Sequence, residues 1–270
     1  MLEHSDEILL TDKNLYKEID FSRYSSIRIG PKADVLVIEE IGEYTEYKIL
    51  GLGNNVLISD AHPPFAVLGS NFDYIEKKED KLHVGCATKS GKLLSYAKKN
   101  DIANLEFLGK LPGSLGGLVK MNAGLKSFEI FNYIHSIKTK DGYIKKEDIE
   151  YSYRHTKINT IVYEVVFNCE QGFCKEQSEL FKKMRENQPQ MPSAGSCFKN
   201  PKNDAAGRLI EAVGLKGFPR GDMSFSREHA NFLVNAGSGT FEDATYLINL
   251  AKQRVKKEFD INLEEEIIIY

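Results

Sequence analysis

This sequence has little net charge, few cysteines and no apolar run of membrane-spanning length. Its 36 Lys and Arg residues are nearly balanced by 39 Asp and Glu residues, which gives a formal net charge of −3. A charge this small argues against binding to nucleic acid or to a membrane surface. A membrane-spanning helix needs about 20 consecutive apolar residues, and no stretch approaches that length. Residues 1–7 include acidic residues where a signal peptide has basic ones, and no apolar segment follows them. We therefore expect a cytoplasmic protein.

The four cysteines do not form a recognisable motif. No two of them are spaced as CxxC, and the reducing cytosol disfavours disulfides. Cys86 and Cys169 lie within apolar runs, so we expect them to be small core residues. Cys197 follows Ser196 and is a candidate nucleophile, but no histidine lies near it in the sequence to act as its base. We expect neither a disulfide nor a metal site.

Short strands dominate the first part of the sequence. The composition, with 41% hydrophobic and 28% charged residues, is that of an ordinary soluble globular protein. A chain of 270 residues can form one large domain or two to three smaller ones. Apolar runs bounded by glycine or charge predict strands. They lie at 34–38, 47–50, 65–68, 81–85, 161–167 and 266–270, with a hairpin over 134–144 that turns at Asp141-Gly142.

Helices dominate the last part of the sequence. Apolar residues at helical spacing predict an early helix over 90–100 with Ser90 as its N-cap, and later helices over 175–187 and 204–213. The clearest helix starts at Thr240, where residues 240–243 resemble a capping box with Asp243 in place of glutamate. Because strands precede residue 175 and helices follow it, we predict an α+β protein that divides near that residue.

The segment 193–201 combines small residues with several polar groups. A turn of small residues presents the hydroxyl of Ser196, and Lys199 and Asn200 follow within four residues. Such a turn can aim a hydroxyl into a cleft, with a cation and an amide beside it to hold an anionic or sugar-like ligand. The alternative is a polar loop in which the serine only caps a turn.

Two glycine-rich segments are candidates for a diphosphate site. They are 50–57, which follows a predicted strand, and 111–117, which is followed by 121–124. Glycine lets the backbone approach an anion closely, and successive N–H groups form an anion-binding nest. The segment 50–57 is neither a Walker loop nor a Rossmann fingerprint. Either segment alone favours a tight turn, whereas two in one strand-rich region are a stronger signal for a diphosphate site.

Together these segments resemble the UDP-N-acetylenolpyruvoylglucosamine reductase family. The resemblance extends over nearly the whole chain, and its motifs occur in the family's order. They are 24–30 (YSSIRIG), 50–57 (LGLGNNVL), 112–117 (PGSLGG), 121–124 (MNAG), 153–156 (YRHT), 194–201 (AGSCFKNP), 206–210 (AGRLI), 229–235 (HANFLVN) and 263–267 (LEEEI). Any one motif is modest, whereas the ordered set is specific.

The resemblance implies a fold and a cofactor. The fold would be α+β, with a two-lobed FAD-binding region of the vanillyl-alcohol-oxidase type over residues 1–175, split near residue 48. A smaller α+β substrate-binding domain would follow over 176–270, and its C-terminal strand would return to the active site. The implied FAD contacts are Gly51, Gly53, Asn54, Asn55, Pro112, Gly113, Ser114, Gly116, Gly117, Asn122, Ala123 and Gly124.

The resemblance also implies a reaction. NADPH would reduce FAD, and the flavin would then reduce the enolpyruvyl ether of UDP-N-acetylglucosamine enolpyruvate, a step of peptidoglycan precursor synthesis. Arg154 would bind the substrate carboxylate, Glu266 would help to stabilise the enol-like intermediate, and Ser196 would protonate the adjacent carbon. The implied contacts to the UDP-sugar are Arg185, Lys199 and Asn200. We expect a monomer whose partners are small molecules only.

The sequence departs from the family pattern at several positions. Asn54 stands where serine is usual, and Asn187 where the family often has lysine. The stretch between residues 38 and 48 is too short for the usual helix. No tyrosine-bearing loop follows Arg154, so the chain resembles the family's shorter subtype. Two alternatives stay open: another flavin oxidoreductase of the same fold, and a flavin- or nucleotide-binding module without turnover. The presence of all three implied catalytic residues argues against the second.

Overall fold

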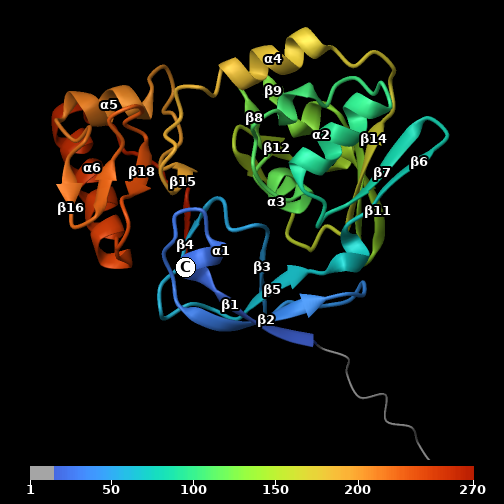
Figure 1. Cartoon of the computed structure of the whole chain (residues 1–270), viewed down its shortest axis with the longest axis horizontal. Coiled ribbons are helices and arrows are strands. Elements are labelled where there is room, and N and C mark those ends of the chain that lie inside the picture. Colours follow the sequence, from blue (N-terminus) through green and yellow to red (C-terminus); the bar gives the residue numbers. More distant parts are fainter. Residues whose placement is uncertain (1–14) are drawn as a thin grey trace, which may run out of the picture.

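The structure, a computed structural model, describes residues 15–270. The signal-peptide argument concerned residues 1–7, which lie outside that range. The described chain forms three sheets of four or five strands, and each belongs to a separate part of the molecule (Figure 1). No helix among the described residues combines the length and apolar character that crossing a bilayer requires.

The first lobe is built on a four-stranded sheet in the order β1-β2-β5-β3. Its strands are β1 (Leu15–Asp20), β2 (Lys32–Ile38), β3 (Lys48–Leu50) and β5 (Phe65–Leu68), with the short helix α1 (Phe21–Tyr24) after β1. β1 is antiparallel to β2, whereas β2, β5 and β3 are parallel. The strands predicted at 34–38, 47–50 and 65–68 are confirmed. No helix lies between β2 and β3, as the short spacing predicted.

The second lobe is an antiparallel five-stranded sheet in the order β11-β10-β14-β7-β6. Its strands are β6 (Ile75–Lys78), β7 (Lys81–Gly85), β10 (Ile134–Thr139), β11 (Gly142–Lys145) and β14 (Glu164–Asn168). The predicted hairpin is β10–β11. The helices and short elements of this lobe are η1 (Ser70–Phe72), α2 (Ser90–Lys99), η2 (Glu106–Leu108), α3 (Leu115–Lys120), β8 (Gly124–Leu125), β9 (Phe128–Glu129), η3 (Ile130–Asn132), η4 (Lys146–Asp148), β12 (Tyr151–Ser152) and β13 (His155–Thr156).

The predicted capping role of Ser90 is wrong. Lys89 occupies the N-cap position of α2, and no side chain caps that end. The Ser90 hydroxyl instead donates to the carbonyl of Leu111 at 2.5 Å, and its N–H donates to the carbonyl of Gly113 at 3.0 Å. The serine therefore joins the start of α2 to the second glycine-rich segment, because its hydroxyl donates to a distant carbonyl instead of accepting from a backbone N–H of the helix.

The C-terminal part is a four-stranded antiparallel sheet in the order β15-β18-β17-β16. Its elements are β15 (Ser193–Ser196), α5 (Ala206–Ala212), β16 (Pro219–Arg220), β17 (Met223–Phe225), β18 (Phe232–Asn235) and α6 (Phe241–Phe259). Thr240 caps α6 as predicted, since its side chain accepts from the N–H of Asp243 at 3.1 Å. The Asp243 carboxylate accepts from Arg220 at 3.2 Å.

Two elements connect the C-terminal part to the rest of the molecule. Helix α4 (Lys175–Lys183) packs on η2 of the second lobe before the chain crosses to β15 (Figure 1). At the other end, β19 (Ile268–Ile269) leaves the C-terminal sheet and pairs in parallel with β4 (Val56–Leu57) of the first lobe. The core of the C-terminal part also includes three first-lobe residues, Ile27, Ile29 and Leu57. The domain boundary at residue 175 remains a prediction.

Candidate functional site

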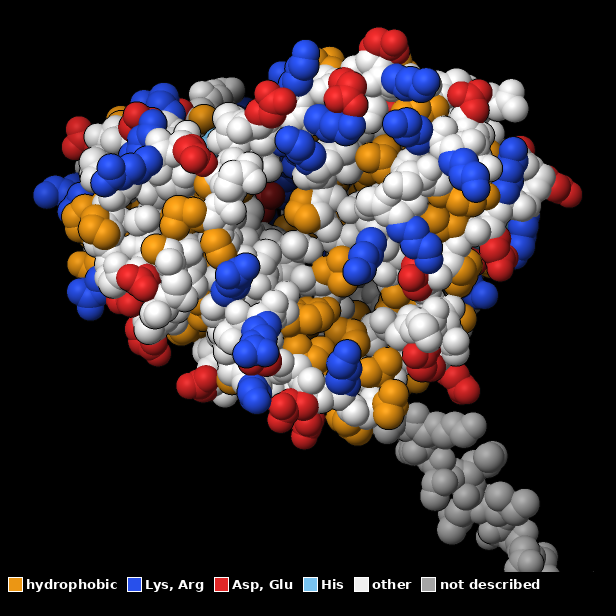
Figure 2. All heavy atoms as spheres, viewed as in Figure 1, with side chains coloured by type: hydrophobic (Ala, Val, Ile, Leu, Met, Phe, Trp, Pro, Cys, Tyr) orange, Lys and Arg blue, Asp and Glu red, His pale blue; other side chains and the backbone are white. Residues whose placement is uncertain are grey.

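A cavity of about 1420 Å³ lies where the two lobes and the C-terminal part meet. Figure 2 shows the molecular surface hollowed near its centre. Sixteen of the residues that the sequence implicates line this cavity. They are Gly51, Gly53, Asn54, Asn55, Pro112, Gly113, Ser114, Gly116, Gly117, Ala123, Gly124, Arg154, Arg185, Ser196, Asn200 and Glu266. Segments separated by as many as 215 residues (51 to 266) therefore converge on one site.

Two of the implicated residues do not line the cavity. Asn122 is fully buried, and its amide donates to Glu129 at 2.9 Å and to the carbonyl of Ser152 at 3.0 Å. Lys199 forms an ion pair with Glu264. Asn122 therefore supports the wall behind the site, whereas the charge of Lys199 is already neutralised.

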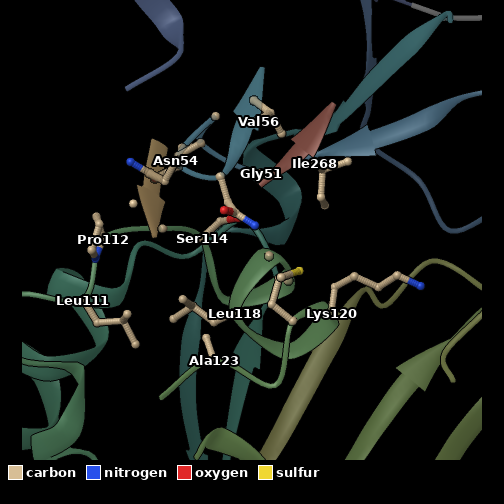
Figure 3. Close-up of a pocket in the computed structure, with 18 of the residues that line it drawn as sticks. Gly51, Asn54, Val56, Leu111, Pro112, Ser114, Leu118, Lys120, Ala123 and Ile268 are labelled. Carbon is tan, nitrogen blue, oxygen red and sulfur yellow. The ribbon is translucent and has the colours of Figure 1, made fainter. Parts of the chain in front are cut away.

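The loop 51–55 presents backbone donors to the cavity. Within the described part of the chain, the backbone N–H groups of Leu52, Gly53, Asn54 and Asn55 donate no hydrogen bond. Figure 3 shows Gly51 next to Ser114, so the two glycine-rich segments face each other. A Cβ atom on Gly51 would lie 2.6 Å from the Ser114 hydroxyl, which only glycine avoids. Consecutive free N–H groups in a narrow cradle are suited to a diphosphate.

Tyr24 and Ser26 hold this loop in place. The Tyr24 hydroxyl donates to the carbonyl of Gly51, and burial raises the pKa of Tyr24 to about 12, so it remains a donor at neutral pH. The N–H of Ser26 donates to the carbonyl of Gly53 at 3.0 Å. Both bonds turn the loop carbonyls toward the protein and leave the N–H groups for the cavity. Apart from the family motif, no pattern in the sequence indicated these two roles.

Arg154 and Glu266 form an ion pair in the cavity wall. The Nε of Arg154 lies 3.0 Å from Oε1 of Glu266, and the two side chains are only 15% and 16% exposed. Arg154 also donates to the carbonyls of Asn122 at 3.4 Å and Gly124 at 3.1 Å. Its φ of +56° is in the left-handed region, which costs a non-glycine residue about 1–2 kcal/mol. The guanidinium is thus held in one orientation at an energetic cost typical of functional sites.

Glu266 has a weakened preference for the charged form. Burial raises the pKa of its carboxyl group, and the positive charge of Arg154 acts in the opposite direction. The net direction is upward. A carboxyl group of this kind can both pair with a cation and exchange a proton more readily than an exposed glutamate.

Ser196 lies at the end of β15, in a part of the strand that departs from regular pairing. The register with β18 shifts between Ser193 and Ser196, and Gly195 between them has a φ of +77° that favours glycine. Among the described residues, the Ser196 hydroxyl has no hydrogen-bond partner, and it lines the cavity. Cys197 is buried, which raises the pKa of its thiol and argues against the nucleophile considered above.

Arg185 is a buried cation with unused donors. Its side chain follows α4, is 7% exposed, and has no hydrogen-bond partner for Nε and Nη2. Burial, with a contribution from the charge of Arg154, lowers the pKa of Arg185 to about 10, so it stays charged at neutral pH. Burying an unpaired charge is costly, and an anionic ligand would compensate for it. Asn200, nearby in the lining, accepts from the N–H of Ala206 at 3.0 Å.

The cavity is more basic than the molecule as a whole. Five lysines and two arginines line it, against the two glutamates Glu43 and Glu266. The lysines are Lys48, Lys110, Lys120, Lys126 and Lys140. Burial and repulsion from Lys48 lower the pKa of Lys120, which also donates to the carbonyl of Ile158. These lysines come from separate elements, so no basic run in the sequence announced them. The field in the cavity attracts anions.

Comparison with known proteins agrees with this geometry. The family described as UDP-N-acetylenolpyruvoylglucosamine reductase, C-terminal domain, matches residues 187–270. A reductase of that name from Helicobacter pylori is 47% identical over 252 residues, covering 93% of this chain and 97% of the relative. One from Campylobacter jejuni is 46% identical over 256 residues, covering 93% and 99%.

The fold agrees as well. The crystal structure of UDP-N-acetylenolpyruvylglucosamine reductase from Thermus caldophilus superposes with a TM-score of 0.82 at 27% identity, covering 95% of this chain and 99% of that one. Both the curated relatives and the solved structure are therefore matched along almost their entire length. The chain belongs to the UDP-N-acetylenolpyruvoylglucosamine reductase family.

Proposed function

We propose that this protein is an FAD-dependent oxidoreductase that uses NADPH to reduce UDP-N-acetylglucosamine enolpyruvate to UDP-N-acetylmuramate. Family membership supports the reaction. The observation that carries the assignment in this chain is the placement of Ser196 in the same cavity as the Arg154–Glu266 ion pair. The cytoplasmic location and the monomeric state remain predictions.

The residues of the cavity fit FAD. The free N–H groups of the loop 51–55 would hold its diphosphate, and the segment 112–117 with Ala123 and Gly124 would lie along the cofactor. The narrow approach at Gly51 supports this, since a larger residue would fill the cradle. When bound, the flavin supplies the hydride-transfer chemistry that no side chain of the protein possesses.

Three side chains would assist the reduction of the substrate. Arg154 is oriented to bind the substrate carboxylate and to stabilise the negative charge that develops there. Glu266 fixes the guanidinium and, with its raised pKa, would help to stabilise the enol-like form. The Ser196 hydroxyl would donate a proton to the carbon adjacent to the one reduced. A positioned general acid of this kind contributes about 10²–10⁴-fold in rate.

The remaining polar residues would bind the UDP-sugar. The unused donors of Arg185 are suited to its diphosphate, and the Asn200 amide to a sugar or phosphate oxygen. Lys199 stays a prediction, because its ammonium group is already paired with Glu264.

A spectroscopic experiment tests the proposal. The purified protein should bind FAD and become yellow, NADPH should bleach the flavin anaerobically, and the enolpyruvyl substrate should restore its colour. A protein that takes up no FAD would contradict the assignment. If flavin reduction by NADPH occurs but the substrate does not reoxidise the flavin, the protein is a different flavin oxidoreductase of this fold.

A further inference from the structure

We propose that the side chain of Asn55 is a positioning residue that couples the loop 51–55 to Glu266. This inference rests on the proposed function, because it assigns Asn55 a part in the reaction attributed to Glu266. The family resemblance implied only that Asn55 lies along the cofactor, whereas its amide group points to the polypeptide that carries Glu266.

Asn55 binds the C-terminal segment at two points. Its Nδ2 donates to the carbonyl oxygen of Glu266 at 2.9 Å, and its own carbonyl accepts from the N–H of Ile268 at 3.0 Å. The two bonds flank Ile267 and fix the backbone of Glu266 relative to the loop. One N–H of the side-chain amide is used in this way, so the amide is anchored to the C-terminal segment and the backbone N–H of Asn55 faces no acceptor of the protein.

The opposite side of Glu266 is fixed to the strand that ends at Ser196. The N–H groups of Glu266 and Ile267 donate to the carbonyl of Cys197 at 2.9 and 3.3 Å. Cys197 is in turn held by the carbonyl of Asn231 at 2.7 Å. The backbone of Glu266 therefore lies between the loop 51–55 and the residue that follows Ser196, and its side chain reaches Arg154.

The pairing of β19 with β4 makes this arrangement resistant to displacement. The N–H of Tyr270 donates to the carbonyl of Leu57 at 2.9 Å, and the N–H of Ser59 donates to the carbonyl of Tyr270 at 2.8 Å. The ring of Tyr270 packs edge-on against Phe65, with centroids 5.1 Å apart. A movement of the loop 51–55 would therefore also move Glu266, because Asn55 and the segment that follows it are paired with the C-terminal strand.

The two half-reactions should differ in how much they depend on the position of Glu266. Reduction of the flavin by NADPH makes no demand on Glu266, whereas reduction of the substrate depends on the placement of Glu266 and Arg154. A misplacement of about 1 Å costs up to about 10²-fold in rate. Loss of the Asn55 amide should therefore slow the second half-reaction selectively.

The experiment compares Asn55→Ala and Asn55→Asp with the unchanged protein. The aspartate keeps the shape but replaces the N–H donor with an acceptor that faces the Glu266 carbonyl. Each FAD-loaded protein is assayed by stopped-flow absorbance for flavin reduction by NADPH and for reoxidation by the enolpyruvyl substrate. FAD affinity is measured by quenching of flavin fluorescence. Asn100→Ala is the matched control, because the exposed Asn100 amide also donates to a carbonyl, that of Tyr96, at 2.9 Å.

We expect both Asn55 variants to reoxidise about 10- to 100-fold more slowly, with flavin reduction within about twofold of the unchanged protein and an unchanged KM for NADPH. The control should match the unchanged protein. The inference is wrong if FAD affinity collapses in both variants, or if the two half-reactions slow equally, or if reoxidation is unaffected. If the unchanged protein fails to reoxidise, the proposed function fails instead.

Discussion

The polar residues of the site differ in how much of their hydrogen-bonding capacity the protein itself uses. Arg154 uses three of its five N–H groups, one each on Nε, Nη1 and Nη2, on Glu266 and on two backbone carbonyls, so two remain for a substrate carboxylate. Arg185 leaves Nε and Nη2 unused although it is buried. Arg154 is therefore oriented before a ligand arrives, whereas Arg185 depends on a ligand to satisfy its donors.

Replacing Ser196 with alanine should separate the two half-reactions. Flavin reduction by NADPH should persist in Ser196→Ala, because the hydroxyl has no part in it. Reoxidation by the enolpyruvyl substrate should slow by about 10²–10⁴-fold, the usual contribution of a general acid. Stopped-flow absorbance measures both rates. Ser95→Ala removes an exposed hydroxyl from α2 and should leave both unchanged. Normal reoxidation in Ser196→Ala would exclude Ser196 as the proton donor.

Replacing Arg185 with methionine should weaken substrate binding without weakening the fold. A hydrogen bond to a charged group contributes about 1.5–3 kcal/mol, so calorimetry should show the UDP-sugar bound at least about tenfold more weakly. The ligand-free variant should melt at the same or a higher temperature, because a buried unpaired charge is removed. Lys182→Met, which removes a partly exposed cation from α4, is the control. A large fall in melting temperature would show that Arg185 has a structural role.

At the scale of elements, the second lobe contains a buried carboxylate with three donors. Glu164 on β14 accepts from Tyr74 at 2.6 Å, from Tyr143 at 2.8 Å and pairs with His83 at 2.9 Å. Burial acts to raise the pKa of this carboxyl group, but the hydrogen bonds together outweigh it and the pKa is lowered. The carboxylate therefore links β7, β11 and β14 across the sheet, together with Tyr74 directly before β6.

The stability of this lobe should depend on pH. A carboxyl group with a lowered pKa stabilises the fold above its unfolded value near 4.5, and that contribution is lost as the pH falls through the folded value. Glu164→Gln should therefore lose about 2 kcal/mol in urea unfolding at pH 7. The difference from the unchanged protein should shrink toward pH 4. The exposed Glu76→Gln should change the unfolding free energy by less than about 0.5 kcal/mol at either pH.

The elements that the sequence predicted correctly are those with local signals. Apolar runs bounded by glycine or charge located β2, β5 and β7, and the capping threonine located the start of α6. The capping role of Ser90 was predicted wrongly because a distant partner decides: its hydroxyl donates to the carbonyl of Leu111. The pairing of Lys199 with Glu264 was not predicted, because it arises where the C-terminal segment returns beside Lys199. Neither partner is adjacent in sequence, so local patterns could not reveal them.

Most of the candidate site was predicted by motif, but its geometry was not. The motifs named Arg154 and Glu266, yet their 3.0 Å contact joins residues 112 positions apart. The support that Tyr24 gives to the loop at Gly51 and the group of lysines in the cavity are also products of tertiary packing. The residue types of a site can be predicted from sequence motifs. Contacts between residues that are distant in the sequence are visible only in the folded structure.

At the scale of the whole molecule, the cavity lies among all three parts, so a ligand in it should stabilise them together. Binding at 100 times Kd adds about 2.7 kcal/mol. FAD should raise the melting temperature of the flavin-free protein in calorimetry. Riboflavin at the same concentration should raise it less, because it lacks the diphosphate that the N–H groups of the loop 51–55 would bind. Equal shifts for the two flavins would contradict a diphosphate site at this loop.

The shared core of the first lobe and the C-terminal part constrains how the family can diversify. Ile27, Ile29 and Leu57 are buried among side chains from beyond residue 193. A chimaera that joins the first 175 residues of one relative to the remainder of another must match shape at these three positions as well as at the junction. Recombination at that point should therefore be tolerated only between relatives with similar side chains there. We therefore expect the two parts to be inherited together as a unit.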